Sequence, residues 1–158
     1  MVGDFRARLE ALDGALYEVR TLRDARDAAR SLIGDRTVAR WADPVLDGIA
    51  EREAPALEAR VSLIVADVAV AETGAIGFAH GAGRPRAAGL LPDRQIALLL
   101  RGDLVASMAQ ALERWFAAVP PRAGNVVFAA GPSRTADIEQ RMMLGVHAPR
   151  SLDVVLYG

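Results

Sequence analysis

Residues 61–78 read Val61-Ser-Leu-Ile-Val-Ala-Asp-Val-Ala-Val-Ala-Glu-Thr-Gly-Ala-Ile-Gly-Phe78. Apolar residues dominate this stretch, and polar breaks at Asp67 and at Glu72-Thr-Gly74 divide it into three short runs. Short, nearly continuous apolar runs rich in β-branched residues are typical of strands that are buried on both faces. The stretch therefore predicts buried strands at 61–65, 68–70 and 75–78.

The pattern continues downstream of this stretch. Further apolar runs predict strands at 95–100, 125–130 and 152–156. Between them, Asp103 can cap a helix that covers Leu104 to Trp115, and residues 135–144 have the pattern of a last helix. Strands that alternate with helices predict an α/β fold with a mostly parallel sheet and helices on both faces.

Residues 1–60 are less strongly patterned. Apolar residues at helical spacing predict a helix over residues 4–16. We expect a strand at 17–20, a second helix at 24–33 that Gly34 ends, and a short strand at 37–41. At 158 residues, the chain is long enough for one compact core, so we expect a single domain.

Composition excludes several kinds of site and partner. The chain has no cysteine, which excludes disulfides, a cysteine-ligated iron–sulfur cluster and a cysteine nucleophile. All 19 basic residues are arginine, which excludes lysine chemistry, and with 20 acidic residues the net charge is −1, so we expect no nucleic-acid partner. The N-terminus and the short apolar runs predict a cytoplasmic protein that does not insert into a membrane.

One loop has the features of a binding site. The apolar run ends at Gly131-Pro132, and Ser133 or Thr135 can then cap the predicted last helix. Exposed N–H groups at such a helix start can hold an anion.

Several separated motifs agree in order with one known family. They are Ala66-Asp67, Ala71-Glu-Thr-Gly74, a glycine- and arginine-containing loop that ends in Arg84, Leu90-Leu-Pro92, Gly131-Pro-Ser-Arg-Thr-Ala-Asp-Ile-Glu139 and Leu144-Gly-Val-His-Ala-Pro149. Together they resemble the LUD-domain, lactate-utilisation protein C (LutC/YkgG) family over about residues 61–156, with a shortened N-terminal part. Gln95 stands where a histidine is usual, and Ala148 stands where a glycine is expected.

The resemblance implies a fold and a cellular role. The implied fold is a Rossmann-like, three-layer sheet of the NagB/RpiA/CoA-transferase type, as one LUD-type domain over residues 1–158. The implied role is in a system whose iron–sulfur companion subunits act with this one to convert L-lactate to pyruvate. We therefore expect no cofactor in this chain, and iron–sulfur clusters only in its partner subunits.

Two residues are candidates for catalysis. Glu72 lies between apolar runs, where a carboxylate is costly unless it is paired or used, so it is either a buried structural group or, by analogy of fold, a nucleophile. His147 is a candidate general base or ligand contact, and a hydrogen bond that fixes its loop is the alternative. His80 and His147 are the only histidines, so we expect no metal site.

Six residues are candidates for binding a small carboxylate or phosphate. Arg84 can supply a guanidinium fork, and the others follow the strand at 125–130: Gly131, Ser133, Arg134, Thr135 and Asp137. Asp137 can instead pair with Arg141. The loop from Gly81 to Arg86 is no dinucleotide fingerprint, because it lacks a third glycine and no helical pattern follows it at once.

Three functional hypotheses follow. In the first, the chain is an accessory subunit without a cluster in L-lactate utilisation, and Glu72, Arg84 and the loop from Gly131 to Thr135 converge on a small anion. In the second, it is a stand-alone enzyme that transforms an acyl or sugar-phosphate substrate through Glu72. In the third, it is a ligand-free scaffold for docking proteins. The first hypothesis predicts that Arg84→Ala weakens binding with little change in melting temperature.

Overall fold

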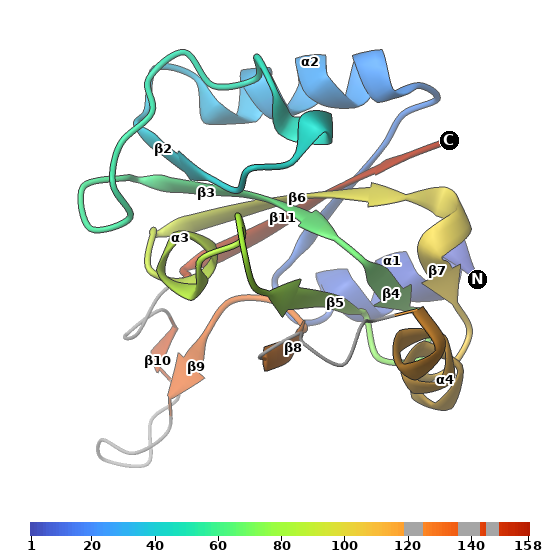
Figure 1. Ribbon diagram of the computed structural model, residues 1–158. Helices are drawn as coiled ribbons and strands as arrows, with labels where there is room; N and C mark the ends of the chain where they lie inside the picture. The colour runs from blue at the N-terminus through green and yellow to red at the C-terminus, as the bar shows by residue number, and fades with distance from the viewer. Residues whose placement is uncertain (119–124, 136–142, 145–148) are drawn as a thin grey trace.

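The centre of the fold is a five-stranded parallel sheet in the order β1-β11-β6-β3-β2 (Figure 1). This computed structural model describes residues 1–118, 125–135, 143–144 and 149–158. The strands of the sheet are β1 (Ala15–Glu18), β2 (Val38–Arg40), β3 (Val61–Ala66), β6 (Arg94–Leu100) and β11 (Ser151–Tyr157). The predicted α/β fold with a mostly parallel sheet is confirmed.

A second, four-stranded sheet has the order β7-β4-β5-β8. Its strands are β4 (Val68–Val70), β5 (Ala75–His80), β7 (Leu104–Val105) and β8 (Asn125–Ala129). β5 pairs antiparallel with β4 and β8, whereas β7 pairs parallel with β4. Asp67 alone separates β3 from β4, so the chain passes from one sheet to the other within a single residue.

Helices and the second sheet cover the central sheet. The helices are α1 (Val2–Glu10), α2 (Leu22–Ile33), α3 (Arg86–Leu90) and α4 (Met108–Ala118), with short 3-10 turns η1 (Pro44–Leu46) and η2 (Arg101–Asp103). Figure 1 shows α2 on one face of the central sheet and α1, α3 and the second sheet on the other. No described helix is long and apolar enough to cross a membrane.

Local sequence explains α2 well. The Thr21 hydroxyl accepts from the Asp24 amide and the Asp24 carboxylate accepts from the Thr21 amide, both at 3.1 Å, which forms a capping box. Ala25, Ala29 and Ile33 repeat every four residues and are buried against the sheet. Gly34, with φ of 61°, ends the helix as predicted.

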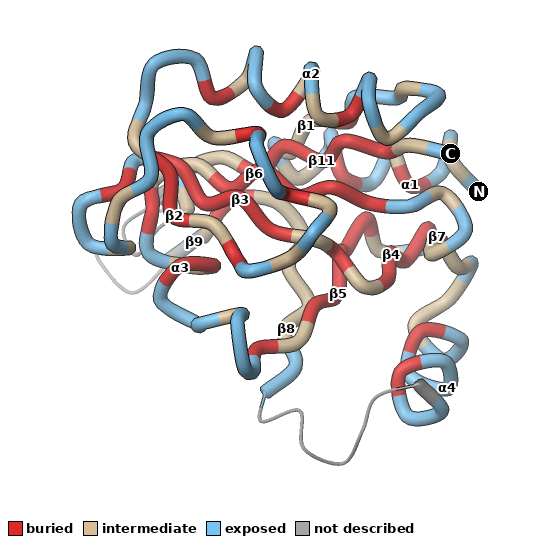
Figure 2. The backbone as a smooth tube through the Cα atoms, turned by 45° about the horizontal axis from the view of Figure 1, so that its top comes forward, coloured by how far each residue is buried: buried red, intermediate tan, exposed pale blue. Residues whose placement is uncertain are grey.

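The core lies around the central strands, where the tube of Figure 2 is almost continuously red. β6 and β11 are each buried at five consecutive positions. The one carboxylate within β11, Asp153, accepts from Arg94 at 2.7 Å and from the Tyr17 hydroxyl at 3.3 Å. These two donors explain how a charged group is tolerated there.

The structure corrects three predicted helices. α1 ends at Glu10, because Leu16 lies in β1. α4 begins at Met108, because Leu104 belongs to β7 and pairs with Ala69. Pairing with strands distant in the chain places Leu16 in β1 and Leu104 in β7, and sequence periodicity does not detect such pairing.

The helix predicted over residues 135–144 is also wrong at both ends. Thr135 belongs to β9 (Arg134–Thr135) and pairs antiparallel with Met143 in β10 (Met143–Leu144). Residues 136–142 lie outside the described part of the chain. The helix start that was expected to present free N–H groups at Ser133 and Thr135 is therefore replaced by a strand.

Candidate functional site

Arg84 is held between two carboxylates at the carboxyl ends of β2 and β3. Its Nη1 donates to Asp67 Oδ1 and Oδ2 at 2.7 and 2.9 Å, and its Nη2 donates to Asp43 Oδ2 at 3.0 Å. The guanidinium carbon lies 5.2 Å from the centroid of the Trp41 ring. Both Nη groups of the predicted anion-binding fork are thus engaged by the protein's own acids.

The two carboxylates are themselves fixed by the backbone. Asp67 Oδ2 accepts from the Ala79 amide at 2.9 Å, which ties the break between β3 and β4 to β5. Asp43 Oδ1 accepts from the Val45 amide at 3.0 Å and so caps η1. We call Asp43, Asp67, Arg84 and Trp41 the Arg84 centre. It joins the loop after β2, the junction of the two sheets and the loop after β5.

A short helix follows Arg84, which the sequence did not indicate. Gly81 and Arg84 exchange backbone hydrogen bonds at 3.2 and 3.0 Å, and α3 begins two residues later. The Trp41 indole N–H donates to the Pro85 carbonyl at 3.2 Å. The contact from Trp41 is distant in the chain, and the five residues of α3 are too few to give a periodic signal of their own.

Glu72 lies at the other end of the β4–β5 hairpin. It is exposed, so the expectation of a buried carboxylate was wrong. Its Oε1 accepts from the Met108 amide at 2.6 Å, at the start of α4, where an acceptor satisfies an otherwise free N–H group. Glu72 also borders a hollow of about 470 Å³ beside α1, together with Arg8.

The loop after β8 packs against the end of α1. Gly131 has a φ of 85°, and a Cβ atom at this position would lie 2.2 Å from the Leu12 carbonyl oxygen. The Ser133 amide donates to the Pro149 carbonyl at 2.9 Å, and Arg134 Nη2 donates to Asp13 at 2.7 Å. Gly131, Ser133 and Arg134 therefore connect the loop after β8 to Leu12, Pro149 and Asp13. Their sequence pattern did not indicate these structural contacts.

The predicted binding and catalytic residues occupy separate places. Glu72 and Arg84 are at opposite ends of the β4–β5 hairpin, so the described structure does not bring them together. Asp137, His147 and Ala148 lie outside the described residues. Within the described ranges, no group of three or more His, Cys, Asp or Glu residues could hold a metal ion.

A second polar cluster lies beneath α3 and was missed as a site. Gln95 Nε2 and Ser62 Oγ both donate to the Gly89 carbonyl, at 2.6 and 3.3 Å. The His80 ring packs edge-on against Trp41 and Phe78. Single polar residues inside apolar strands are the signal that could have identified this cluster.

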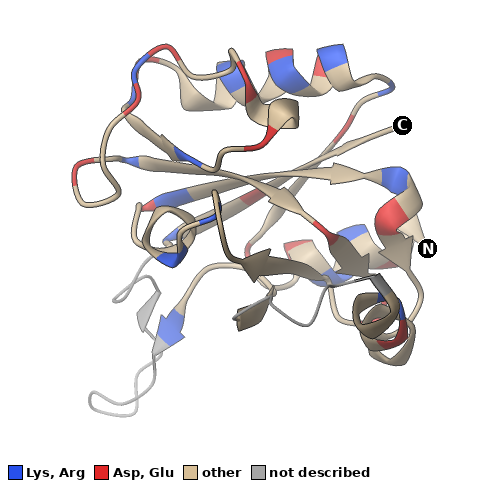
Figure 3. Ribbon diagram, viewed as in Figure 1, with Lys and Arg blue, Asp and Glu red and all other residues tan. Residues whose placement is uncertain are grey.

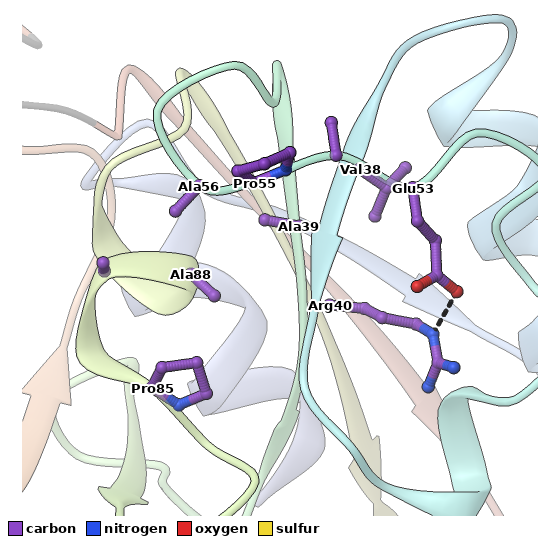
Figure 4. Close-up of a pocket in the computed structure, with 10 residues that line it drawn as sticks. Val38, Ala39, Arg40, Glu53, Pro55, Ala56, Pro85 and Ala88 are labelled. Carbon is purple, nitrogen blue, oxygen red and sulfur yellow. Dashed lines mark hydrogen bonds and ion pairs between the residues drawn. The ribbon is translucent and has the colours of Figure 1, made fainter.

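The outer side of α3 borders a hollow of about 240 Å³, shown in Figure 4. Pro85 and Ala88 face it from the α3 side, and Ala39 and Ala56 face it from β2 and the following loop. Arg40 lies at its edge and is paired with Glu53 at 2.5 Å and with Asp47 at 3.1 Å. Most of the other lining residues have small apolar side chains, and the polar side chains of the lining, Arg40 and Glu53, are paired with each other.

Charge does not single out a face. Basic and acidic residues of the described chain are mixed over the same helices, strand ends and loops in Figure 3. Most of the described ion pairs involve side chains more than one-third exposed on at least one side, where such pairs contribute little stability. The Arg84 centre is different, because its three charged side chains are all less than one-third exposed.

Comparisons with known proteins identify relatives of this chain. "Lactate utilization protein C" of Exiguobacterium sp. is 36% identical over 106 residues, which cover 64% of this chain and 45% of that protein. The protein of the same name from Halalkalibacterium halodurans is 35% identical over 95 residues, 58% of this chain and 41% of the relative. The chain thus matches less than half the length of these curated relatives.

The fold and the family are both supported. A crystal structure of a DUF162 family protein from Deinococcus radiodurans superposes with a TM-score of 0.75, covering 99% of this chain and 96% of that one, at 23% identity. A family model described as the LUD domain matches residues 34–157, which extends the resemblance upstream of the motifs that begin near residue 61. This chain belongs to the LUD-domain family.

Proposed function

We propose that this chain serves L-lactate utilisation as a LUD-domain component that carries no cluster and acts with iron–sulfur companion subunits. The observation that carries the proposal is the 36% identity to a protein named "Lactate utilization protein C" over 64% of the chain. The absence of cysteine from all 158 residues supports a division of labour in which partners hold the redox centres.

The finer part of the proposal is a small carboxylate or phosphate ligand. We place it beside the Arg84 centre, at the carboxyl ends of the parallel strands, where α/β sheets commonly bind ligands. An anion there would compete with Asp43 and Asp67 for the Arg84 guanidinium, so binding requires one of these contacts to open. Gly131, Ser133, Arg134 and Thr135, in the loop after β8, remain candidates for contacting the ligand, as does Asp137, which lies outside the described residues.

Co-purification tests the proposal most directly. The tagged chain is recovered from its native cells grown on lactate, and proteins that accompany it are identified by mass spectrometry. Cells grown on another carbon source and cells that carry the tag alone are the controls. Iron–sulfur proteins enriched only with the tagged chain are the expected result, whereas a chain that emerges alone contradicts the subunit role.

Acyl transfer through Glu72 has weaker support. The carboxylate is exposed and one of its oxygens accepts from the Met108 amide, which leaves it occupied in stabilising α4. Hydroxylamine trapping after incubation with acyl-CoA tests this alternative, because an acyl-glutamyl adduct would support it.

A ligand-free scaffold would show no rise in melting temperature with any member of a small-molecule panel.

A further inference from the structure

The cluster beneath α3 contains buried polar atoms that lack partners. His80 is 6% exposed and Gln95 is fully buried. Neither imidazole nitrogen of His80 has a hydrogen-bond partner among the described residues, and the same is true of Gln95 Oε1. Burying a polar atom without a hydrogen bond costs about 1–3 kcal/mol, so three such atoms in one place need an explanation.

The residues that carry these atoms lie on separate strands and meet at Gly89. Gln95 lies on β6, Ser62 on β3 and His80 at the end of β5. Gln95 and Ser62 donate to the Gly89 carbonyl, and the His80 ring carbon Cε1 lies 3.3 Å from where a Cβ of Gly89 would stand. We call His80, Gln95, Ser62 and Gly89 the α3 site. It lies next to the Arg84 centre, because Trp41 contacts both the His80 ring and the Arg84 guanidinium.

A ligand can reach the α3 site only if α3 shifts. Toward the core, its backbone accepts hydrogen bonds from Trp41, Ser62 and Gln95. Its other side presents Ala87 and Ala88 to the hollow of Figure 4. Small side chains lose little packing when they shift, and a ligand group can replace a carbonyl as the partner of Gln95 or Ser62.

The chemistry of the site defines its ligand. Gln95 Oε1 is an acceptor and requires a donor such as a hydroxyl group, while the imidazole of His80 offers one donor and one acceptor when neutral. We propose that the α3 site binds a short hydroxy acid, whose hydroxyl donates to Gln95 Oε1 and whose carboxylate accepts from the His80 ring. This inference rests on the proposed function, because it assigns a substrate class to the ligand expected beside Arg84.

Binding should be coupled to a proton. Burial, followed by the charge of Arg86, lowers the pKa of His80, which favours the neutral ring in the free protein. The other charged groups nearby are Arg84 and the acids that hold it, Asp43 and Asp67; β3 and β6 contribute only the uncharged Ser62 and Gln95. A buried carboxylate favours the imidazolium form, so the hydroxy acid raises the pKa of His80 and binds more tightly as the pH falls toward 6.

Nuclear magnetic resonance of the imidazole groups tests this on the unmodified protein. L-Lactate, propionate and 1,2-propanediol are titrated, and the His80 signals are identified by their loss in His80→Asn. L-Lactate should shift the His80 ring signals and raise its pKa, whereas propionate, which lacks the hydroxyl, should bind at least about ten-fold more weakly. Gln95→Leu should reduce lactate affinity by a similar factor, and Arg60→Ala, far out on the surface, should not change it.

Two results would overturn the inference. One is an unchanged His80 spectrum at millimolar concentrations of lactate and longer hydroxy acids. The other is a crystal structure of the protein soaked in lactate in which only water contacts His80 and Gln95. If co-purification succeeds while both ligand tests fail, the proposed α3 site is wrong and the subunit role stands. If the chain binds lactate but no partners co-purify with it, the α3 site stands and the subunit role is wrong.

Discussion

Arg84 and Asp67 form a two-oxygen ion pair: one guanidinium nitrogen lies 2.7 Å from Oδ1 and 2.9 Å from Oδ2 of the same carboxylate. Asp43 accepts from the other Nη at 3.0 Å, and all three side chains are less than one-third exposed. Arg84 therefore stabilises the junction of the two sheets.

Arg84→Ala should therefore lower the free energy of unfolding by about 2 kcal/mol, because two partly buried carboxylates lose their cation. This reverses the expectation from sequence that the melting temperature would hardly change. Urea denaturation measures the loss. Arg60→Ala is the matched control, since Arg60 is 72% exposed and its pair with Asp93 should contribute no more than about 0.5 kcal/mol. Equal midpoints for the two variants would contradict the structural role of Arg84.

Gly131→Ala should destabilise the protein by at least about 2 kcal/mol, because the new Cβ meets the Leu12 carbonyl oxygen and the backbone has a positive φ. Gly102→Ala is its control, since a Cβ at Gly102 meets nothing within 4 Å. Thermal unfolding followed by circular dichroism compares them. A Gly131→Ala protein as stable as Gly102→Ala would show that the contact between this loop and α1 is absent in solution.

Removing Glu72 should weaken α4. Glu72→Ala deprives the Met108 amide of its acceptor and should cost about 1 kcal/mol, whereas Glu72→Gln keeps a carbonyl oxygen and should cost less. Equilibrium unfolding of both variants measures the difference. If Glu72→Ala leaves stability unchanged but abolishes acyl transfer, the carboxylate acts chemically rather than as a helix cap.

Stability should fall at mildly acidic pH because of His80. Its pKa is lowered in the folded protein, so below the unfolded value of about 6.5 the unfolded chain binds a proton that the folded chain rejects. The stability that comes from the neutral His80 ring is fully present above that pH. It is lost as the pH falls toward the lowered pKa of the folded protein. Denaturation midpoints measured from pH 7.5 down to 5 should show this slope, and His80→Gln should flatten it. A slope that persists in His80→Gln would assign the effect to other groups.

The strands of the core were predictable because their signal is local. β4 has the predicted bounds, and β3, β6 and β11 differ from prediction by one residue at one or both ends. What failed depends on residues that are distant in the chain. The division into two sheets depends on strand pairing, and α3 is held by Trp41 and Gln95.

The same limit applies to the site. Arg84 and the glycine-rich loop before it were identified as polar features of the chain, but the partners of Arg84 are 17 and 41 residues away. Glu72 was predicted to be buried because apolar residues flank it in the sequence. The sharp turn in which it lies exposes it instead. Neither His80 nor Gln95 was predicted to form a site, because each is a single polar residue in its own segment. The fold brings both residues next to Gly89.

The position of β11 has a consequence for how the protein is made. It follows every other described strand in the chain, yet it lies between β1 and β6, and β1 has no other neighbour in the sheet. During synthesis, β1 must therefore wait for a partner that leaves the ribosome after every other described strand, and the hydrogen-bonding edge of β1 stays open until then. A nascent chain stalled before residue 151 should consequently be a target for chaperones, while release of β11 should complete the sheet in one step.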